Sequence, residues 1–208
     1  MFGNSLISKF GAFSEIAVHG HVPEERAMLY SAIDGCSTEI ETLNFLNALV
    51  ISWKPKLVIE TGAFRGFGTI AIAAALKTNG FGKVYTCELD PNRMQECKDN
   101  VEAYNEELLP YIEFVCGDSL DLCRKFDHGK IDFAFLDSET WLRYQEFEIL
   151  RDRGMFSEHA VMMTHDTSRL RSASGGNENS DLNEALDALD VKGSIEFPFS
   201  RGFRVFQL

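Results

Sequence analysis

The sequence predicts an α/β protein built on one seven-stranded sheet, mostly parallel, with an antiparallel hairpin at its C-terminal end and helices on both faces. Three observations support this prediction. Short apolar segments alternate with segments of helical period along most of the chain. The first apolar segment, 57–59, runs into a glycine-rich turn and a helix, as at the start of a parallel sheet. The last two apolar segments flank the short turn Ser200-Arg201-Gly202, as in a hairpin.

Length and composition bound the kind of protein. A chain of 208 residues suits a single domain, 1–208, with enough residues for a complete central sheet. We expect residues 1–53 to form a helical cap and residues 54–208 to form the core that carries the site. The apolar content of 45% is ordinary for a globular protein, and no apolar run approaches the ~20 residues of a membrane span. We expect no signal peptide, because the N-terminus lacks a basic region followed by a long apolar one.

Charge and cysteine content indicate partners and compartment. The net charge of −12 repels phosphate backbones and anionic membrane surfaces, so we expect neither nucleic acid nor a membrane as partner. The five cysteines are odd in number and form no Cys-x-x-Cys pair, which favours free thiols in the reducing cytoplasm. Apolar helices near the N-terminus and exposed aromatic residues are compatible with a homodimer.

Two helices are predicted before the first strand. Val22-Pro23-Glu24-Glu25 has the proline and acids of a first helical turn, and Gly35 is expected to end that helix. Thr38 and Glu41 have the spacing of a capping box, and the apolar residues after them repeat at helical spacing as far as Trp53. These helices would form the N-terminal cap on the sheet.

A glycine-rich turn follows the first strand. Its order is acid-x-Gly-x-x-x-Gly-x-Gly, from Glu60 through Gly62 and Gly66 to Gly68. Glycines allow a tight turn and let backbone N–H groups approach a ligand closely. The spacing differs from the Gly-x-Gly-x-x-Gly of dinucleotide-binding folds, which makes a nicotinamide-dependent enzyme a poor hypothesis. A strand–helix turn without any ligand is the simpler alternative.

Polar residues stand at the ends of the next two predicted strands. The second strand, 83–87, ends on Glu88, and a carboxylate at this place can accept hydrogen bonds from both hydroxyls of a ribose. Asp90 and Pro91 then have the pattern of an N-cap and first helical residue. The third strand, 112–116, is followed by Gly117-Asp118-Ser119, which alone is also ordinary turn chemistry.

The fourth and fifth predicted strands place acids at the same edge of the sheet. The strand 131–136 ends on Asp137, and the strand 160–164 is followed by His165-Asp166-Thr167. Ligands of open α/β sheets bind at this carboxyl edge. The segment 168–180 is predicted to be a mobile lid beside the site. The other predicted elements are a helix from Ser138 to Gly154, a helix at 181–189, and strands at 195–199 and 203–207.

Through these motifs, residues 38–208 resemble the class I S-adenosylmethionine-dependent methyltransferases, which have a Rossmann-like fold. The branch they resemble is that of the catechol O-methyltransferase-like enzymes, which includes bacterial small-molecule O-methyltransferases. In that branch the glycine turn holds the methionine part of the cofactor, an acid like Glu88 holds the ribose, and the segment after the third strand holds the adenine. The resemblance therefore implies these cofactor-binding residues: Glu60, Thr61, Gly62, Ala63, Phe64, Gly66, Gly68, Thr69, Glu88, Leu89, Gly117, Asp118, Ser119 and Asp137.

The same resemblance implies a metal site. Asp137 matches an aspartate that binds a divalent metal, and Asp166 matches the second metal carboxylate. Hard oxygen ligands suit Mg²⁺ or Ca²⁺, and such an ion can bind an acceptor hydroxyl and lower its pKa. Thr167 stands where the family commonly has a third ligand, asparagine.

Three roles are open for His165. It could deprotonate the acceptor, bind the metal, or be hydrogen-bonded to a neighbour at the strand end. The catechol enzymes have a lysine base shortly after the first aspartate, and Ser138-Glu139-Thr140-Trp141 contains none, so we do not expect catechol itself as substrate.

The sequence therefore predicts an S-adenosylmethionine-dependent methyltransferase that acts on a hydroxyl of a small molecule with the help of a divalent metal. Asp137, His165 and Asp166 are the predicted catalytic residues, and Asp137 and Asp166 the predicted metal ligands. Two alternatives remain open. The first is a metal-independent O- or N-methyltransferase, and the second is a cofactor-binding scaffold without catalytic activity.

Overall fold

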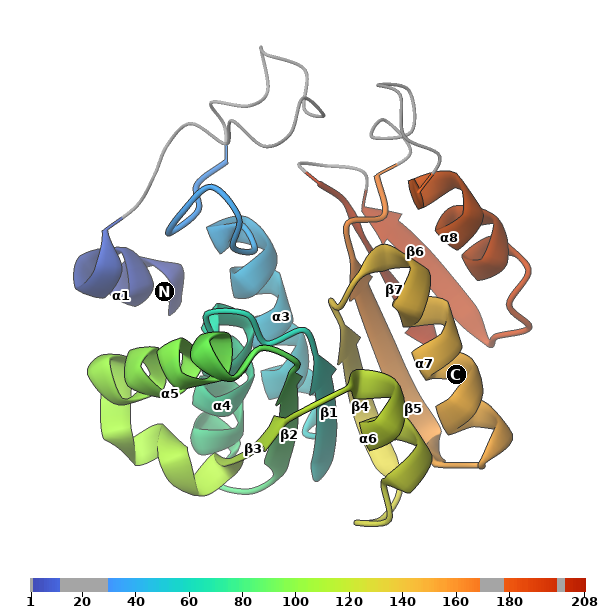
Figure 1. The fold of residues 1–208 in the computed structure, drawn as a ribbon, viewed down its shortest axis with the longest axis horizontal. Helices are drawn as coiled ribbons and strands as arrows, with labels where there is room; N and C mark the ends of the chain where they lie inside the picture. The colour runs from blue at the N-terminus through green and yellow to red at the C-terminus, as the bar shows by residue number, and fades with distance from the viewer. Residues whose placement is uncertain (1, 12–29, 169–177, 198–200) are drawn as a thin grey trace.

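The protein is a single mixed sheet covered by helices on both faces, as described by a computed structural model for residues 2–11, 30–168, 178–197 and 201–208 (Figure 1). The strands run in the order β3-β2-β1-β4-β5-β7-β6. The first five are parallel, and β7 is antiparallel to both β5 and β6. This confirms the predicted fold class. The strands are β1 Leu57–Thr61, β2 Lys83–Glu88, β3 Ile112–Cys116, β4 Ile131–Leu136, β5 Phe156–His165, β6 Gly193–Phe197 and β7 Phe203–Gln207.

The helices divide between the two faces of the sheet. One face is covered by α1, α3, α4 and α5, and the other by α6, α7 and α8 (Figure 1). Their bounds are α1 Phe2–Phe10, α3 Ile40–Trp53, α4 Phe67–Asn79, α5 Pro91–Asn105, the 3-10 helix η1 Glu106–Tyr111, α6 Ser119–Lys125, α7 Thr140–Asp152 and α8 Glu178–Asp187. None of the helices in the described ranges has the length and apolar composition needed to cross a bilayer.

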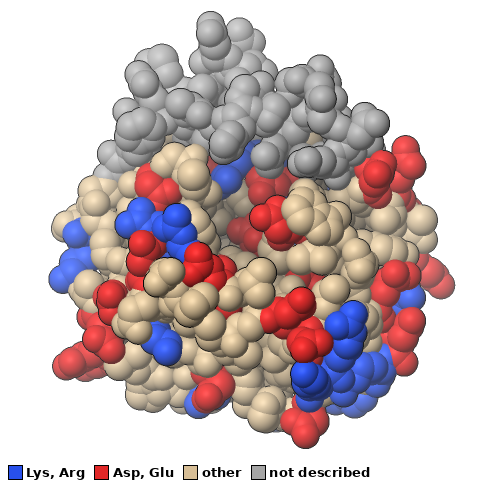
Figure 2. Space-filling view, viewed as in Figure 1, with Lys and Arg blue, Asp and Glu red and all other residues tan. Residues whose placement is uncertain are grey.

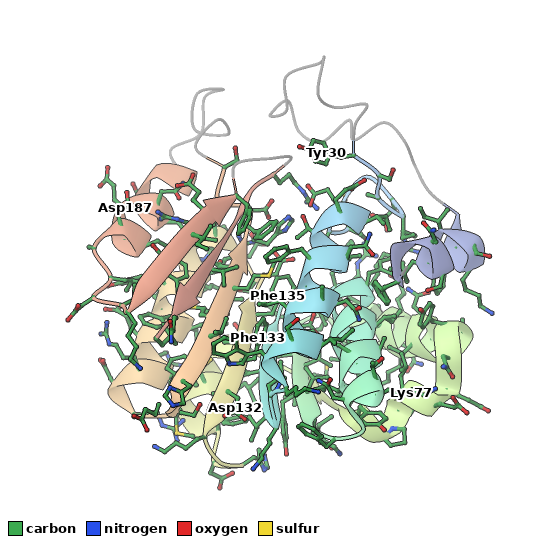
Figure 3. All side chains as sticks on the ribbon, turned by 180° about the vertical axis from the view of Figure 1, so that it is seen from behind. Tyr30, Lys77, Asp132, Phe133, Phe135 and Asp187 are labelled. Carbon is green, nitrogen blue, oxygen red and sulfur yellow. The ribbon has the colours of Figure 1, made fainter. Side chains whose placement is uncertain are left out.

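Alternation along the strands separates the two cores. Phe133 and Phe135 of β4 point toward α3 and α4 (Figure 3), whereas Ala134 and Leu136 belong to the cluster under α6, α7 and α8. All four side chains are buried. Since successive strand residues face opposite sides, a strand covered on both faces is apolar throughout. The run 133–136 therefore has the pattern of a strand that is buried on both faces.

Several predicted boundaries are wrong because side chains make contacts that the sequence pattern does not show. Residues 22–29 of the first predicted helix lie outside the described ranges, and residues 30–39 are not helical. There the Asp34 carboxylate accepts from the backbone N–H groups of Cys36 and Ser37, which favours a turn. The capping box is also wrong, because Glu39 is the N-cap of α3 and Thr38 donates instead to Asp137.

Elements near the C-terminus differ from the prediction in their ends. Glu139, not Ser138, is the N-cap of α7, and β5 begins earlier than expected, at Phe156. The last helix spans Glu178–Asp187, and the described part of β6 is Gly193–Phe197, with residues 198–200 outside the described ranges. Most of the predicted lid, residues 169–177, lies outside the described part of the chain.

The hairpin that carries β7 holds the turn after β5 in place. The N–H of Thr167 donates to Gly202 O at 3.2 Å, and the N–H of Ser168 donates to Arg201 O at 2.9 Å. Gly202 has φ +78°, and a Cβ there would lie 2.5 Å from Ser168 N. Only glycine lets the two segments approach this closely. The contact places Arg201 beside the end of β5.

We predict that Gly202→Ala destabilises the fold more than Gly80→Ala. Both positions have left-handed backbones, φ +78° and +79°, which cost alanine about 1–2 kcal/mol. Gly80 has open space around the added Cβ, whereas at Gly202 the hairpin must move away from Ser168, which adds about 1–3 kcal/mol. Urea unfolding measures both losses. Equal losses would show that the contact with Ser168 does not constrain the fold.

Candidate active site

A cavity of about 430 Å³ opens at the carboxyl ends of the parallel strands. Figure 2 shows acidic side chains bordering a hollow near the middle of the face seen in Figure 1. Most of the predicted site residues line this cavity: Glu60, Gly62, Ala63, Phe64, Gly68, Glu88, Leu89, Gly117, Asp118, Ser119, Asp137, His165 and Asp166. Thr61, Gly66 and Thr69 do not line it, and their contacts lie within the protein.

Glycines are required in the turn because the chain is closely packed there. The N–H groups of Gly62 and Ala63 both donate to Cys87 O at 3.0 Å, and a Cβ on Gly62 would overlap the backbone of Asp137. Gly66 has φ +84° and would bring a Cβ to 2.6 Å from Cys97 Sγ. A Cβ on Gly68 would overlap the Glu60 carboxylate. The motif thus keeps β1, β4 and α5 tightly packed around the cavity floor.

Glu60 is a buried carboxyl group at that floor. Thr69 and Thr86 donate to its Oε2 at 2.6 and 2.7 Å. Burial raises its pKa to about 7, against the lowering effect of the two threonines, and the charges of Asp137 and Glu88 raise it further. The group can therefore change its charge near neutral pH, and a cationic ligand would favour its ionised form.

Glu88 and Asp118 both brace backbone turns at the cavity. Glu88 accepts from Phe64 N at 2.8 Å and from Asp90 N at 3.0 Å. Asp118 accepts from the first turn of α6, as an N-cap does. Ser119 donates to the buried Glu146 at 2.5 Å. Leu89, by contrast, is 69% exposed at the cavity mouth.

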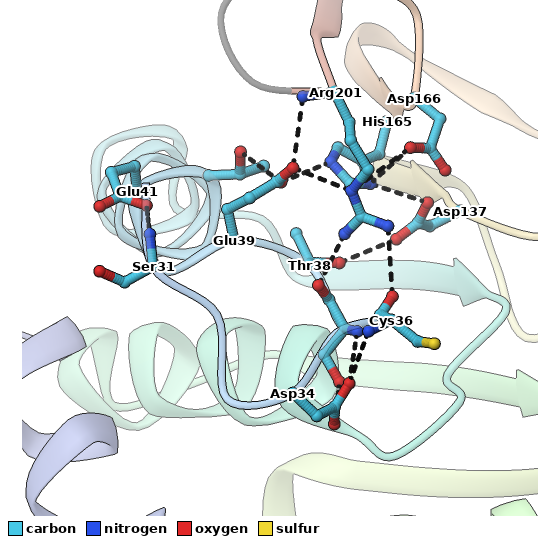
Figure 4. A network of polar contacts seen from close by, with 12 residues as sticks. Ser31, Asp34, Cys36, Thr38, Glu39, Glu41, Asp137, His165, Asp166 and Arg201 are labelled. Atoms are coloured by element: carbon cyan, nitrogen blue, oxygen red, sulfur yellow. Dashed lines mark hydrogen bonds and ion pairs between the residues drawn. The ribbon is translucent and has the colours of Figure 1, made fainter. Parts of the chain in front are cut away.

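His165 lies between two carboxylates at the other end of the cavity (Figure 4). Its Nε2 is 2.8 Å from Glu39 Oε2, and its Nδ1 is 3.2 Å from Asp137 Oδ1. Burial opposes a charge on the ring, but the carboxylates of Asp137, Asp166 and Glu39 outweigh burial and raise the pKa of His165 to about 9. The ring is therefore an imidazolium at neutral pH. It has to lose its proton and one of these bonds before it can act as a base.

Two arginines complete this cluster, and sequence reasoning missed both. Arg143 Nη2 is 3.3 Å from Asp137 Oδ1 and 3.2 Å from Asp166 Oδ2. Arg201 Nε donates to Glu39 Oε1 at 2.8 Å and lies 3.6 Å from Asp166 Oδ1 (Figure 4). Glu39 was missed as well, and it is completely buried. Nothing in the spacing of these residues could have identified them, because each reaches the site from a different segment.

The predicted metal fits these residues poorly. Asp137, His165 and Asp166 offer ligand atoms within 4.8 Å of one another, so their geometry alone could hold an ion. However, Arg143 lies between the two carboxylates, and His165 would have to lose its proton. Thr167, at the position of the third ligand, is completely buried and does not line the cavity.

Known proteins resemble this chain in sequence family and fold. A family model described as a methyltransferase domain matches residues 59–167. The sequence matches no curated protein at a significant level. A putative O-methyltransferase from Klebsiella pneumoniae superposes with a TM-score of 0.71 at 15% identity, over 84% of this chain and 83% of that one.

Two further structures with this fold contain the cofactor or its product. The O-methyltransferase TomG from Streptomyces achromogenes, involved in tomaymycin synthesis, is in complex with S-adenosylmethionine. It has a TM-score of 0.69 at 17% identity, over 83% and 81% of the chains. An O-methyltransferase from Bacillus cereus in complex with S-adenosylhomocysteine has a TM-score of 0.69 at 19% identity, over 84% of each chain. At identities this low, the structural similarity shows that these proteins share a fold with this chain.

The raised pKa of Glu60 predicts a pH-dependent stability. The folded protein keeps the proton up to about pH 7, whereas the unfolded chain releases it near the ordinary value of 4.5. The folded state therefore binds more protons in this window, and stability falls as the pH rises through it, by roughly 3 kcal/mol. Glu60→Gln cannot ionise at this position, so at pH 8 it should be more stable than the wild type by about this amount.

Urea unfolding of wild type and Glu60→Gln at pH 5 and pH 8 measures the effect. Glu102→Gln, which changes an exposed glutamate, serves as the control and should follow the wild type at both values. If the unfolding free energies of Glu60→Gln and the wild type differ by the same amount at pH 5 and at pH 8, the pKa assigned to Glu60 is contradicted.

Proposed function

Because this chain belongs to the methyltransferase-domain family, we propose that it is an S-adenosylmethionine-dependent methyltransferase that acts on a hydroxyl of a small molecule. One observation above all supports this proposal. The glycine turn, Glu88, Asp137 and Asp166 all line a single cavity. A cofactor and an acceptor could therefore lie next to each other at the carboxyl edge of the sheet, where such folds bind ligands.

The chain supplies a cradle for the cofactor in this proposal. S-adenosylmethionine, when bound, would supply a methyl group activated by its attachment to a sulfonium. The glycine turn would bind the methionine part, with Glu60 beneath it as the carboxylate that faces a cation. Glu88 would bind the ribose, and Leu89 with the segment from Gly117 to Ser119 would enclose the adenine.

At the acceptor end the carboxylates would orient the hydroxyl and take its proton. Methyl transfer is an in-line displacement, so a large part of the catalysis comes from positioning the attacking oxygen. Asp166 is our choice for the proton acceptor, because its carboxylate lines the cavity and is less enclosed than His165, whose two nitrogens are already bonded. In this proposal His165 orients Asp137 and stabilises it by its charge.

The N-terminal segment would belong to the acceptor site. We propose that residues 1–53 form a cap on the core 54–208, as the sequence suggests. Thr38 donates to Asp137 at 3.0 Å, and Glu39 contacts both His165 and Arg201. These contacts support a role for the segment in shaping the place of the acceptor.

Two versions of the acceptor chemistry differ in the need for a metal. The cluster of Asp137, His165 and Asp166 supports the predicted Mg²⁺ or Ca²⁺. The guanidinium group between the two aspartates favours the metal-independent alternative, in which the acceptor is an oxygen or a nitrogen. Turnover after treatment with a chelator separates the two versions.

We expect the protein to bind S-adenosylhomocysteine with micromolar affinity, about −8 kcal/mol, in calorimetric titration with and without Mg²⁺ after chelator treatment. Glu88→Gln should weaken this binding about 10- to 100-fold, because a hydrogen bond to a charged group contributes ~1.5–3 kcal/mol. Glu113→Gln, on the neighbouring strand β3 and exposed, should bind as the wild type does.

Since Glu88 also braces the turn at Phe64, unfolding of the free variant shows whether the loss is structural. Failure of the wild type to bind S-adenosylhomocysteine in either condition would contradict the methyltransferase proposal and favour the inactive scaffold.

Asp166→Asn should reduce turnover about 10²- to 10⁴-fold while the affinity for S-adenosylhomocysteine stays nearly intact. Asparagine suits the position because Asp166 has a left-handed backbone, φ 59°, which asparagine tolerates and alanine does not. Release of S-adenosylhomocysteine is measured over a panel of hydroxylated small molecules. An equal loss of turnover and affinity would place the acceptor elsewhere.

A further inference from the structure

We propose that Arg143 takes the place of a divalent cation between Asp137 and Asp166, so that the acceptor site works without a metal. The inference rests on the proposed methyltransferase function and deepens it. It makes Arg143 a positioning residue, one that holds the two carboxylates that face the acceptor. It also assigns the reaction to the metal-independent version.

Distances around Arg143 support this proposal. One nitrogen, Nη2, lies 3.3 Å from Asp137 Oδ1 and 3.2 Å from Asp166 Oδ2. An ion that bound both carboxylates would sit between the same two oxygens, at about 2.0–2.6 Å from each. A guanidinium group is always charged, so an ion there would meet a positive charge at close range. The two cations therefore exclude each other.

Arg143 is fixed and cannot give way to an ion easily. Its side chain is only 5% exposed, its Nε donates to Ser138 O at 2.6 Å, and its Nη1 donates to His165 O. Ser138 directly follows Asp137, and His165 is the last residue of β5, directly before Asp166. If the guanidinium left, one buried and one partly buried carbonyl group would lose their donor, which is costly.

Other side chains occupy the remaining approaches. Arg201 lies 3.6 Å from Asp166 Oδ1, and its other nitrogens donate to Cys36 O and Ser37 O. The His165 ring covers a further side of Asp137, with Nδ1 3.2 Å from Oδ1. Each aspartate thus already has an arginine as its cationic partner, and Asp166 has two.

Binding of Mn²⁺ tests the proposal directly on the wild-type protein. The chelator-treated protein is titrated with Mn²⁺ and free ion is followed by electron paramagnetic resonance. We expect no binding up to about 1 mM, the range of the weakest protein cation sites. Mn²⁺ binding below that concentration that Asp166→Asn abolishes would overturn the proposal.

Variants of Arg143 test the role of this residue. Arg143→Met should bind Mn²⁺ at least about tenfold more tightly than the wild type, because the positive charge between the aspartates is gone. Arg143→Lys keeps the charge and should not bind Mn²⁺. Arg151→Met, on the same helix but with a half-exposed side chain, is the matched control and should behave as the wild type.

Unfolding curves identify a variant that no longer folds, and Arg143→Gln, which keeps hydrogen-bond donors at this position without the charge, then replaces Arg143→Met with the same expectation. No gain of Mn²⁺ affinity in a folded Arg143 variant would overturn the role given to Arg143. The affinity for S-adenosylhomocysteine is measured on the same samples. If the wild type does not bind S-adenosylhomocysteine, the proposed methyltransferase function is contradicted. The Mn²⁺ titration still decides separately whether a metal binds between the two aspartates.

Discussion

Three carboxylates meet at the carboxyl end of β5, and the fold of the acceptor end depends on neutralising them. Glu39 is completely buried, and Asp137 and Asp166 are largely so. Buried charges are tolerated only when they are paired and hydrogen-bonded. Here the partners are Arg143, Arg201 and His165. The pairing ties the N-terminal segment, the ends of β4 and β5, helix α7 and the C-terminal hairpin together around one end of the cavity.

The part of the cavity proposed to bind the cofactor is built by a different principle. Its contacts are mostly local: Glu88 braces Phe64 and Asp90, Glu60 accepts from Thr69 and Thr86, and the turn bonds to Cys87. All of these residues belong to one strand–turn–helix–strand unit, 57–90, whose glycines allow the close packing. Such an arrangement is encoded in a short, continuous stretch of sequence.

This difference explains what could be predicted. The strand Ile112–Cys116 and the Asp90–Pro91 helix start have the predicted bounds, because β-branched and aromatic residues in a short run and helix capping are local signals. The capping box at Thr38 failed because Glu41 accepts from Ser31 and Thr38 donates to Asp137. Arg143 was hidden in a helix with the usual alternation of polar and apolar residues, and Arg201 in a hairpin turn. Asp166 lies 23 residues from Arg143, and Glu39 lies 162 residues from Arg201, so no spacing in the sequence could show these contacts.

The two groups of carboxylates at the cavity therefore differ in whether the protein itself neutralises them. At the acceptor end the protein's own cations neutralise the carboxylates, so an added ion would bring excess positive charge. At the cofactor end, no ion pair among the described residues involves Glu60 or Glu88. Burial of Glu60 without a cation raises its pKa to about 7 and costs the free protein stability. A ligand that carries a net positive charge, as S-adenosylmethionine does, would give ionised Glu60 a favourable electrostatic partner. The unfavourable burial of this carboxyl group in the free protein would then be relieved on binding, which would add to the affinity for the cofactor.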